Sequence, residues 1–303
     1  MRAMKPGDSN MRVRPGLHRG MARVVVSGLG LILLAWLLWH LLGWAVWRAE
    51  FRADAAACQA LQHQGACWGV VAEKGPQWLL GRVVESAPGQ PWQPAGLPLT
   101  LMLFGLSWLL SWPLAIGLAL ARRSPRRWLH WPAVAIIEAV RGVPGVTLLF
   151  MAAFLLPLLW PQGEAPALVW RATAVLSVFS AVYLAEIVRG GLQTVPKEQS
   201  EAAHTLGLGW WATQGRIVLP QALRAVLPAL TSHAIGLLKD SSLVMVIGLH
   251  ELTGGLSLSL SGDPVWRAFY FEAYLFVGLV YALMCLALAR LGRHLETRWP
   301  QAL

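Results

Sequence analysis

Apolar residues in this chain occur in runs of about 20, separated by shorter polar segments. A run of about 20 apolar residues is the length that an α-helix needs to cross the hydrocarbon core of a bilayer. A transmembrane β-barrel would instead show alternating segments of about 10 residues. The pattern therefore predicts an all-α, polytopic membrane protein with about six transmembrane helices, which we place at residues 24–47, 97–121, 131–159, 169–188, 221–249 and 271–289.

The composition agrees with this class. Hydrophobic residues make up 56% of the 303 residues, charged residues make up 13%, and the mean hydropathy is +0.52. A soluble protein of this length could not bury so much apolar surface. The formal net charge is +10, as in many nucleic-acid-binding proteins, but here the Lys and Arg residues flank the apolar runs. We therefore expect a lipid bilayer as the surroundings and no nucleic-acid partner.

The distribution of Lys and Arg predicts the orientation in the membrane. Residues 1–23 form a basic tail, an arginine cluster follows the second run at residues 122–127, and further arginines follow the last run. Basic residues near membrane spans are retained on the cytoplasmic side. Both termini are therefore predicted to be cytoplasmic, and segment 48–96 is predicted to lie outside.

Two of the three cysteines, Cys58 and Cys67, lie in this external segment. An even pair of cysteines in an oxidising compartment favours a disulfide, and a short separation along the chain allows one. Two unpaired thiols are the alternative. The sequence has no His-Glu-x-x-His or paired Cys-x-x-Cys motif and no phosphate-binding Gly-x-x-x-x-Gly-Lys-Ser/Thr loop, so we expect neither a metal site nor an ATPase site of that kind in this chain.

Residues 195–220 are the one long internal segment that is not apolar. Pro196 can begin a helix, because the first turn does not need its missing N–H. Glu198 then lies in the first turn, where the helix dipole favours an anion. Gly207 and Gly209 supply a stop. We expect a short helix outside the membrane, followed by a sharp return into it.

Three groups of ionisable residues lie inside or at the end of predicted spans, where a charge is costly and marks a functional hypothesis. Glu138 and Arg141 are three residues apart, so they share a helix face and can neutralise each other. Glu186 and Arg189 repeat this spacing at the cytoplasmic end of the fourth span. For this second pair, near the interface, we favour a structural ion pair.

Lys239 and Asp240 form the third group, in the fifth span, and two serines follow them. Adjacent helical residues do not face each other, so we expect each of the two charges to pair with another helix. Structural pairing and a role in a transport pathway both remain open for the first and third groups. The candidate pathway residues are Glu138, Arg141, Lys239, Asp240, Ser241 and Ser242.

One spacing in the polar segment is specific. Glu201-Ala202-Ala203 is followed after three residues by Gly207 and, after nine more, by Ile217-x-Leu219-Pro220. This pattern resembles the EAA loop of the membrane subunits of bacterial ABC importers of the binding-protein-dependent type. In that family the loop forms a coupling helix that docks into a cleft of a cytoplasmic ATPase subunit. The resemblance therefore implies ATPase-coupling roles for Glu201, Ala202, Ala203, Gly207, Leu219 and Pro220.

Further motifs narrow the resemblance to permeases for polar amino acids. Residues 137–144, Ile-Glu-x-x-Arg-Gly-Val-Pro, and residues 183–191, Tyr-x-Ala-Glu-x-x-Arg-Gly-Gly, are similar to motifs of that subfamily. The resemblance covers about residues 97–296 and implies the core fold of a type I ABC importer. Residues 65–68, Gly-Ala-Cys-Trp, also resemble the outer loop of broad-specificity L-amino-acid permeases, which usually carry two further spans between that loop and the core.

The resemblance implies a transport subunit of the bacterial inner membrane and not an enzyme. Such a permease moves an amino acid by alternating access. Its partners are a second permease subunit, identical or different, cytoplasmic ABC ATPase subunits and a periplasmic amino-acid-binding protein. ATP and Mg would be bound by the ATPase partner, and this chain would hold no cofactor. The choice among amino acids does not follow from the sequence.

Two other functions are compatible with the pattern. An ion-coupled secondary transporter could use Glu138, Lys239 and Asp240 as a proton relay, but such transporters typically show repeated halves and need no coupling loop. Dependence on a separate ATPase distinguishes the importer from this transporter. A membrane scaffold without a transport role would tolerate replacement of its intramembrane polar residues without loss of uptake.

Overall fold

The computed structural model describes most of the chain, namely residues 16–61, 64–81, 94–161 and 165–299. Within these ranges the regular structure is helical, apart from two isolated β-bridges. The prediction of an all-α membrane protein is thus confirmed. By its internal contacts the chain divides into two compact units, residues 1–69 and residues 70–303.

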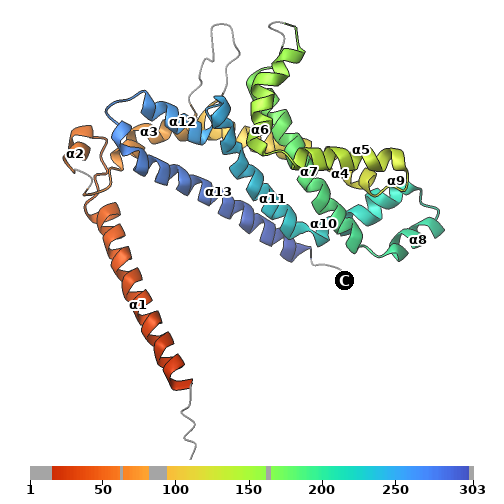
Figure 1. The fold of residues 1–303 in the computed structure, drawn as a ribbon, viewed down its shortest axis with the longest axis horizontal. Coiled ribbons are helices and arrows are strands. Elements are labelled where there is room, and N and C mark those ends of the chain that lie inside the picture. The colour runs from red at the N-terminus through yellow and green to blue at the C-terminus, as the bar shows by residue number, and fades with distance from the viewer. Residues whose placement is uncertain (1–15, 62–63, 82–93, 162–164, 300–303) are drawn as a thin grey trace, which may run out of the picture. The chain divides into compact units, whose positions relative to one another are not determined.

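The first unit begins with helix α1, Gly16–Leu42, which continues through a π-helical turn at Gly43–Trp47 (Figure 1). The stretch Val24–Trp47 is long and apolar enough to cross a membrane, as the sequence predicts for the first span. Because α1 starts at Gly16, the last part of the predicted basic tail 1–23 is helical. The part of the tail before Gly16 lies outside the described residues.

The segment after α1 folds into a small disulfide-closed motif. Asp54 Oδ1 accepts hydrogen bonds from two backbone N–H groups at 3.0 and 3.2 Å and so caps helix α2, Ala55–Ala60. Cys58 and Cys67 form a disulfide with Cα atoms 5.4 Å apart, and both residues are buried. Of the two alternatives for these cysteines, the structure has the bridge.

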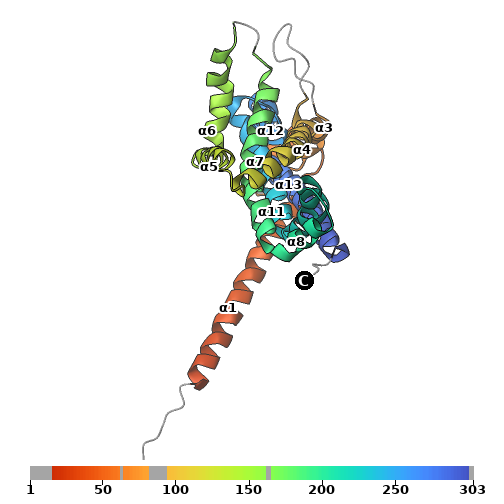
Figure 2. The same ribbon diagram turned by 90° about the vertical axis from the view of Figure 1, so that its right-hand side faces the viewer.

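The second unit contains the remaining helices, and α11 and α13 run side by side in it (Figures 1 and 2). Its α-helices are α3 Gly69–Leu80, α4 Gly96–Arg122, α5 Arg127–Arg141, α6 Gly145–Phe150, α7 Leu168–Thr194, α8 Lys197–Thr205, α9 Trp210–Thr213, α10 Leu219–Ala225, α11 Leu227–Asp240, α12 Leu252–Ser261 and α13 Tyr270–Arg298.

The packing of α4 against α7 forms the centre of this unit. The inward side of α4 carries small, fully buried residues four positions apart, Ser107, Ser111, Ala115 and Ala119. Ala181 of α7 belongs to the same core cluster as Ala115 and Ala119. Small side chains let two helices approach closely, and in a bilayer this close contact is a main source of helix association.

Five helical stretches of the described chain are long and apolar enough to cross a membrane, and a bent pair raises the number to six if it counts as one span. The predicted third span, residues 131–159, is this bent pair, since α5 and the stretch Gly145–Leu159 meet at 98°. Pro144 accounts for the break, because it lacks an N–H and disfavours helical backbone at Val143. One interrupted span therefore becomes two helices at nearly a right angle.

The predicted fifth span, residues 221–249, is also divided. α10 ends at Ala225, α11 runs from Leu227 to Asp240, and a 3₁₀ turn covers Ser241–Ile247. Pro228 has no N–H to donate to the carbonyl of residue 224, which explains the first break. The stretch that qualifies as a membrane span is Leu227–Ile247.

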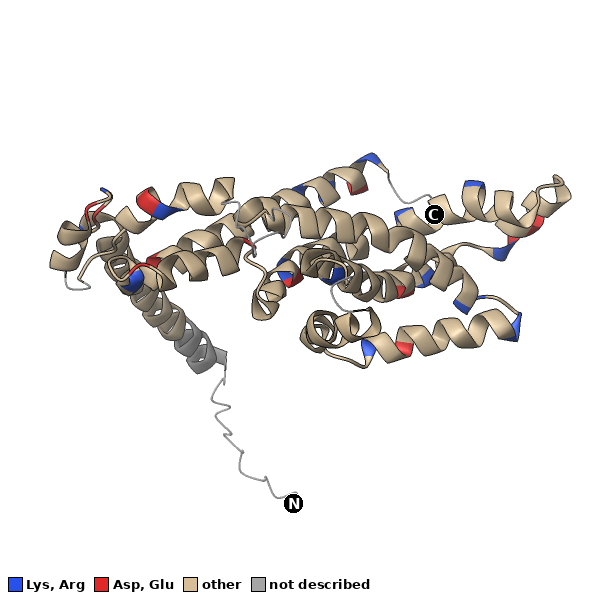
Figure 3. Ribbon diagram, turned by 90° about the horizontal axis from the view of Figure 1, so that it is seen from above, with Lys and Arg blue, Asp and Glu red and all other residues tan. Residues whose placement is uncertain are grey.

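Other helix limits differ from those expected. α7 continues to Thr194, past the predicted end at residue 188, and α13 extends beyond residues 271–289 at its C-terminal side. Figure 3 shows Lys and Arg of this unit mainly at helix ends. The polar ends of these helices hold their charges away from the long apolar stretches, which is the distribution that a bilayer requires.

Candidate functional site

The short helix predicted in the polar segment 195–220 is present as α8, Lys197–Thr205, immediately after Pro196. The chain reverses at Gly207, whose φ is +77°, a value that favours glycine. The N–H of Gly207 donates to the carbonyl of His204 at 2.9 Å, and the N–H of Leu208 donates to that of Ala203 at 3.0 Å. These two bonds close the helix end in the manner typical of a glycine C-cap.

The six residues assigned to ATPase coupling fall into two groups. Glu201, Ala202 and Gly207 are exposed, whereas Ala203 turns inward and is buried. Leu219 and Pro220 begin α10 and are half-buried, and Leu219 packs against the core. Glu201, Ala202 and Gly207 are therefore accessible to a partner, whereas Leu219 and Pro220 form the first turn of α10.

An apolar surface adjoins α8. Leu206 is 79% exposed, Trp211 is 78% exposed and Trp210 is 47% exposed. Large apolar side chains at an exposed helix end are suited to contact with another protein or with the membrane interface. The sequence motif does not include these three residues. The feature of the sequence that could have identified this surface is the pair of tryptophans within an otherwise polar segment.

Four charged residues from three helices form an ion-pair network. Arg122 Nη2 of α4 lies 3.1 Å from Glu138 Oε1 of α5, and Arg122 Nη1 lies 2.9 Å from Glu186 Oε1 of α7, without hydrogen-bond geometry in the second case. Arg189 Nη2 lies 2.9 Å from Glu186 Oε2. The expected pair Glu186–Arg189 is thus present, within a larger network.

The expected pair Glu138–Arg141 is not formed. Glu138 pairs with Arg122 instead, because the packing of α5 against α4 brings the two side chains together. Arg141 lies over the ring of Tyr183 of α7, with its Cζ atom 5.5 Å from the ring centroid. Spacing along one helix showed which residues share a face, but the neighbouring helices decided the partners.

Tyr183 belongs to a polar and aromatic cluster that sequence reasoning missed. Its ring stacks on that of His233 of α11 with centroids 6.4 Å apart, and His233 lies 6.0 Å from Trp108 of α4. The Nε2 atom of His233 is 3.0 Å from Oγ of Ser180. A histidine within an apolar run was the available signal, since ionisable residues there are uncommon.

Lys239 and Asp240 occupy the end of α11. Lys239 is exposed and Asp240 is half-buried, and in the described part of the chain neither forms an ion pair with another helix, contrary to expectation. The helix that packs most closely on α11 is α13, which has no charged residue between Glu272 and Arg290. No opposite charge is therefore available on that side.

The two serines that follow bind backbone within their own helix. Ser241 Oγ donates to the carbonyl of Leu238 and Ser242 Oγ to that of Lys239, both at 2.7 Å. Ser241 is buried, whereas Ser242 is half-buried. Hydroxyls used in this way satisfy the helix end, so a contact with a transported molecule would require them to rotate.

A buried carboxylate joins three elements at the other end of the bundle. Glu251 is fully buried and accepts hydrogen bonds from Gly254 N–H at 2.8 Å and from Tyr281 OH of α13 at 2.8 Å. Thr253 N–H and Thr100 Oγ1 of α4 donate to it at 3.0 and 3.3 Å. Burial raises the pKa of this carboxyl, and the hydrogen bonds oppose that rise.

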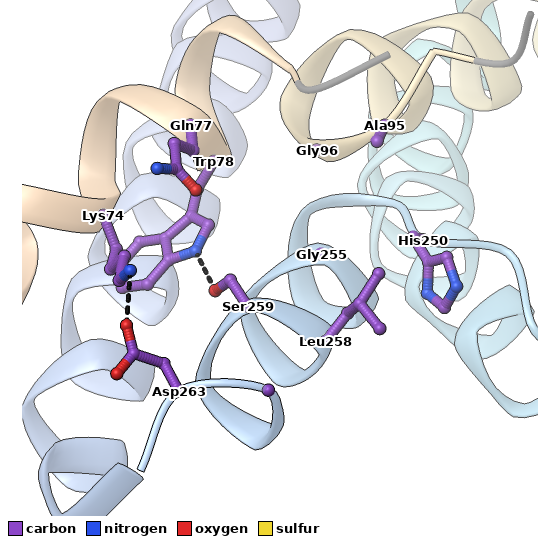
Figure 4. Close-up of a pocket in the computed structure, with 11 residues that line it drawn as sticks. Lys74, Gln77, Trp78, Ala95, Gly96, His250, Gly255, Leu258, Ser259 and Asp263 are labelled. Carbon is purple, nitrogen blue, oxygen red and sulfur yellow. Dashed lines mark hydrogen bonds and ion pairs between the residues drawn. The ribbon is translucent and has the colours of Figure 1, made fainter. Parts of the chain in front are cut away.

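A cavity of about 340 Å³ lies between α3, the start of α4 and α12 (Figure 4). Lys74 Nζ and Asp263 Oδ2 form an ion pair at 2.7 Å beside it, and the Trp78 indole N–H donates to Ser259 Oγ at 2.7 Å. The hydrogen bond from Lys74 is the main cause of a lowered pKa for the Asp263 carboxyl. These two contacts hold α3 against α12.

Among the described residues no cluster of three or more His, Cys, Asp or Glu is arranged to hold a metal ion.

Comparison with known protein families gives one match. The model of the family described as "Binding-protein-dependent transport system inner membrane component" matches residues 111–300. This range includes α5, the bend after Arg141, the ion-pair network on α7, and α8.

Two curated relatives from bacteria are similar over most of the chain. The inner membrane amino-acid ABC transporter permease protein YhdY of Escherichia coli (strain K12) is 39% identical over 79% of this chain and 66% of its own length. The glutamate/glutamine/aspartate/asparagine transport system permease protein BztC of Rhodobacter capsulatus is 40% identical over 67% of this chain and 47% of its own length. The match thus spans just under two thirds of the first relative and about half of the second.

Solved structures show the same fold. An amino acid ABC transporter crystallised with histidines is 28% identical, with a TM-score of 0.61 over 75% of this chain and 96% of that chain. An inward-facing MetNI methionine ABC transporter is 20% identical, with a TM-score of 0.51 over 65% of this chain, and shows the fold alone.

Proposed function

The chain belongs to the family of inner-membrane components of binding-protein-dependent transport systems, and from that membership we propose that it is the permease subunit of an ATP-driven amino-acid importer. The names of its relatives support amino acids as the substrate class. The observation that carries the proposal is α8, an exposed helix between two membrane-length stretches, with a glycine-defined end and an adjoining apolar surface.

We assign each partner to the face of this chain on which it would have to bind. A cytoplasmic ATPase subunit, which binds ATP and Mg, docks on α8 and on the apolar surface of Leu206, Trp210 and Trp211. A periplasmic amino-acid-binding protein meets the opposite side, and a second permease subunit completes the pathway. This orientation, with both termini cytoplasmic, agrees with the basic residues around the α4–α5 turn on the side that carries α8.

The structure suggests how movement of α8 would reach the bundle. α8 follows α7 after only two residues, and α10 packs against α7 so closely that a Cβ at Gly191 would clash with the carbonyl of Ala222. The network of Arg122, Glu138 and Glu186 ties α7 to α4 and α5. A displacement of α8 by the ATPase would therefore move these helices together, as alternating access by rigid-body motion requires.

The candidate pathway residues keep this role as a proposal. Arg141 is exposed and lies over the ring of Tyr183, and Lys239, also exposed, has no ion-pair partner among the described residues of this chain. Glu138 takes part in the ion-pair network, so we assign it mainly to helix packing. The two competing proposals predict different outcomes. A proton relay predicts transport without an ATPase, whereas a non-transporting scaffold predicts no transport at all.

Co-purification of the detergent-solubilised chain with its native partners tests the proposal. We expect an ATPase subunit to associate, and we expect Glu201→Lys to release it, because a reversed charge on the exposed face of α8 would oppose docking. Glu296→Lys on α13 is the matched control, and it should leave the association unchanged. If no ATPase associates under any nucleotide condition, the proposal is wrong, and uptake driven by a proton gradient should be measured instead.

A further inference from the structure

Arg141 is the exposed last residue of α5, at the bend between the two paired helical stretches, and it has no carboxylate partner among the described residues. Its guanidinium contacts the face of Tyr183, a cation–π interaction. The acids on the adjoining helices are already occupied, because Glu138 pairs with Arg122 and Glu186 pairs with Arg122 and Arg189. An exposed guanidinium that has no anion within the chain can bind a carboxylate from outside it.

We propose that Arg141, seated on the ring of Tyr183, binds the α-carboxylate of the amino acid during its passage, an inference that rests on the proposed importer function. A guanidinium in contact with a ring face keeps its N–H groups at its edge, where a carboxylate can accept two parallel hydrogen bonds. Every α-amino acid carries this carboxylate whatever its side chain. One arginine can therefore serve a range of substrates.

The side chains behind Arg141 suit an amino acid in transit. Tyr183 and Trp108 present half-buried rings from α7 and α4, and His233 of α11 lies near both, with its Nε2 atom 3.0 Å from Oγ of the buried Ser180. Such a mixture offers hydrogen bonds and apolar contact. When His233 is neutral, the fixed charge of this group of side chains is that of Arg141. The guanidinium then supplies the common anchor, and the neighbouring rings accommodate different side chains.

The position of Arg141 also links binding to movement. Arg141 is the last residue of α5, and the chain turns by 98° into the following helical stretch. A change in that bend would shift the guanidinium relative to Tyr183 on α7. A cation at a helix C-terminus is also favoured by the helix dipole, so a purely structural role is the alternative that a test must separate.

The test uses the complex of this chain with its ATPase, without the binding protein, so that only the permease selects the ligand. The probes are L-histidine, L-glutamine and L-arginine and the α-amide of each, which keeps the side chain and loses the carboxylate. We expect Arg141→Gln to weaken binding of the amino acids roughly 10- to 100-fold and to leave binding of the amides unchanged. Arg141→Lys keeps the helix-end charge without the planar fork and should lie in between.

Two matched comparisons separate this role from folding. Tyr183→Phe keeps the ring under Arg141 and should bind like the parent, whereas Tyr183→Leu removes the ring and should weaken amino acids more than amides. Arg126→Gln removes an exposed arginine at the start of α5 and should have no effect. Equal membrane insertion of all variants is checked by their yield after solubilisation.

Each outcome decides the inference. Equal amino-acid binding by the parent and Arg141→Gln overturns it, and so does an equal loss for amino acids and amides, which would indicate a structural role. If the reassembled importer takes up amino acids with ATP but the complex without binding protein binds none of the probes, the inference fails and the proposed function stands. If no common L-amino acid is taken up with ATP, the proposed function fails and the inference fails with it.

Discussion

Helix α8 and the ion-pair network of Arg122, Glu138, Glu186 and Arg189 are both polar parts of an apolar protein, but they are built in opposite ways. α8 is one continuous segment that exposes most of its side chains, whereas the network collects four side chains from α4, α5 and α7. Surface charge on α8 remains free to meet a partner. Charge in the network is neutralised within the chain, so it holds helices together instead of recruiting anything.

This difference separates two kinds of polar residue in one membrane protein. A change in α8 should alter coupling to the ATPase and leave the fold intact. A change in an interior contact should lower stability first and transport second. The following predictions test that division, in order of the expected size of effect.

Gly207→Val should have the largest effect on transport. At φ +77° a β-branched residue carries about 1–3 kcal/mol of backbone strain, although a Cβ would meet nothing within 4 Å. The angle at which the chain leaves α8 would change, and we expect ATP hydrolysis uncoupled from uptake, with uptake reduced roughly tenfold or more. Uptake and ATPase activity are measured in the same proteoliposomes.

Gly209→Ala is the matched control for that prediction. Gly209 has an ordinary φ of −67° and, like Gly207, open space around an added Cβ. The alanine variant should therefore transport like the parent. Normal coupled uptake by Gly207→Val would show that α8 does not need this defined exit.

Glu251→Ala should cause the largest loss of stability. The substitution leaves the donors of Tyr281, Thr100 and two backbone N–H groups without their acceptor, at about 1–3 kcal/mol for an unsatisfied buried group. Thermal unfolding in detergent should show a clear drop in the midpoint. Glu296→Ala, at a half-buried position on α13, serves as the control and should stay within about 0.5 kcal/mol of the parent.

Glu251→Gln should change how stability depends on pH. Burial raises the pKa of Glu251 in the folded chain above 4.5, so its contribution to stability is fully present below pH 4.5 and is lost as the pH rises through the folded pKa. The parent should therefore lose stability relative to Glu251→Gln as the pH rises above 4.5. Burial lowers the pKa of the adjacent His250, an effect that both proteins share. Parallel curves for the two proteins would contradict the prediction.

Glu186→Gln should destabilise the bundle more than Glu138→Gln. The side chain of Glu186 is 18% exposed and pairs with two arginines, whereas that of Glu138 is 55% exposed and pairs with one. We expect about 1–2 kcal/mol for Glu186 and at most about 1 kcal/mol for the more exposed pair. Thermal midpoints of both variants decide the order, and a larger loss for Glu138→Gln would show that exposure does not rank these pairs.

Lys239→Ala and Asp240→Ala should have the smallest effect on the fold. Neither residue forms an ion pair with another helix in the described part of the chain, so surface-like losses within about 0.5 kcal/mol are expected. If they line the pathway, substrate affinity or uptake rate should change while the thermal midpoint does not. Uptake like that of the parent across all tested amino acids would remove both residues from the pathway.

Much of the architecture could be predicted because it depends on short stretches of sequence. Runs of about 20 apolar residues predict membrane helices wherever they are long enough, and Pro196 and Gly207 mark the limits of α8 by their own backbone preferences. The match of the motif around Glu201 to a known family added the function that such a helix serves. None of these inferences required knowledge of which helices are neighbours.

The partners of the charged side chains could not be predicted in the same way. Glu138 and Arg141 share a helix face, yet α4 supplies Arg122 to the first and α7 supplies Tyr183 to the second. Glu251 lies between the predicted spans 221–249 and 271–289, and its role depends on Thr100 and Tyr281, which are distant in sequence. Local sequence thus determined the helices, their approximate limits and the exposed helix α8. Only the tertiary structure decided the angle of the bend that Pro144 introduces and the pairing of charges, because both depend on how the helices pack against one another.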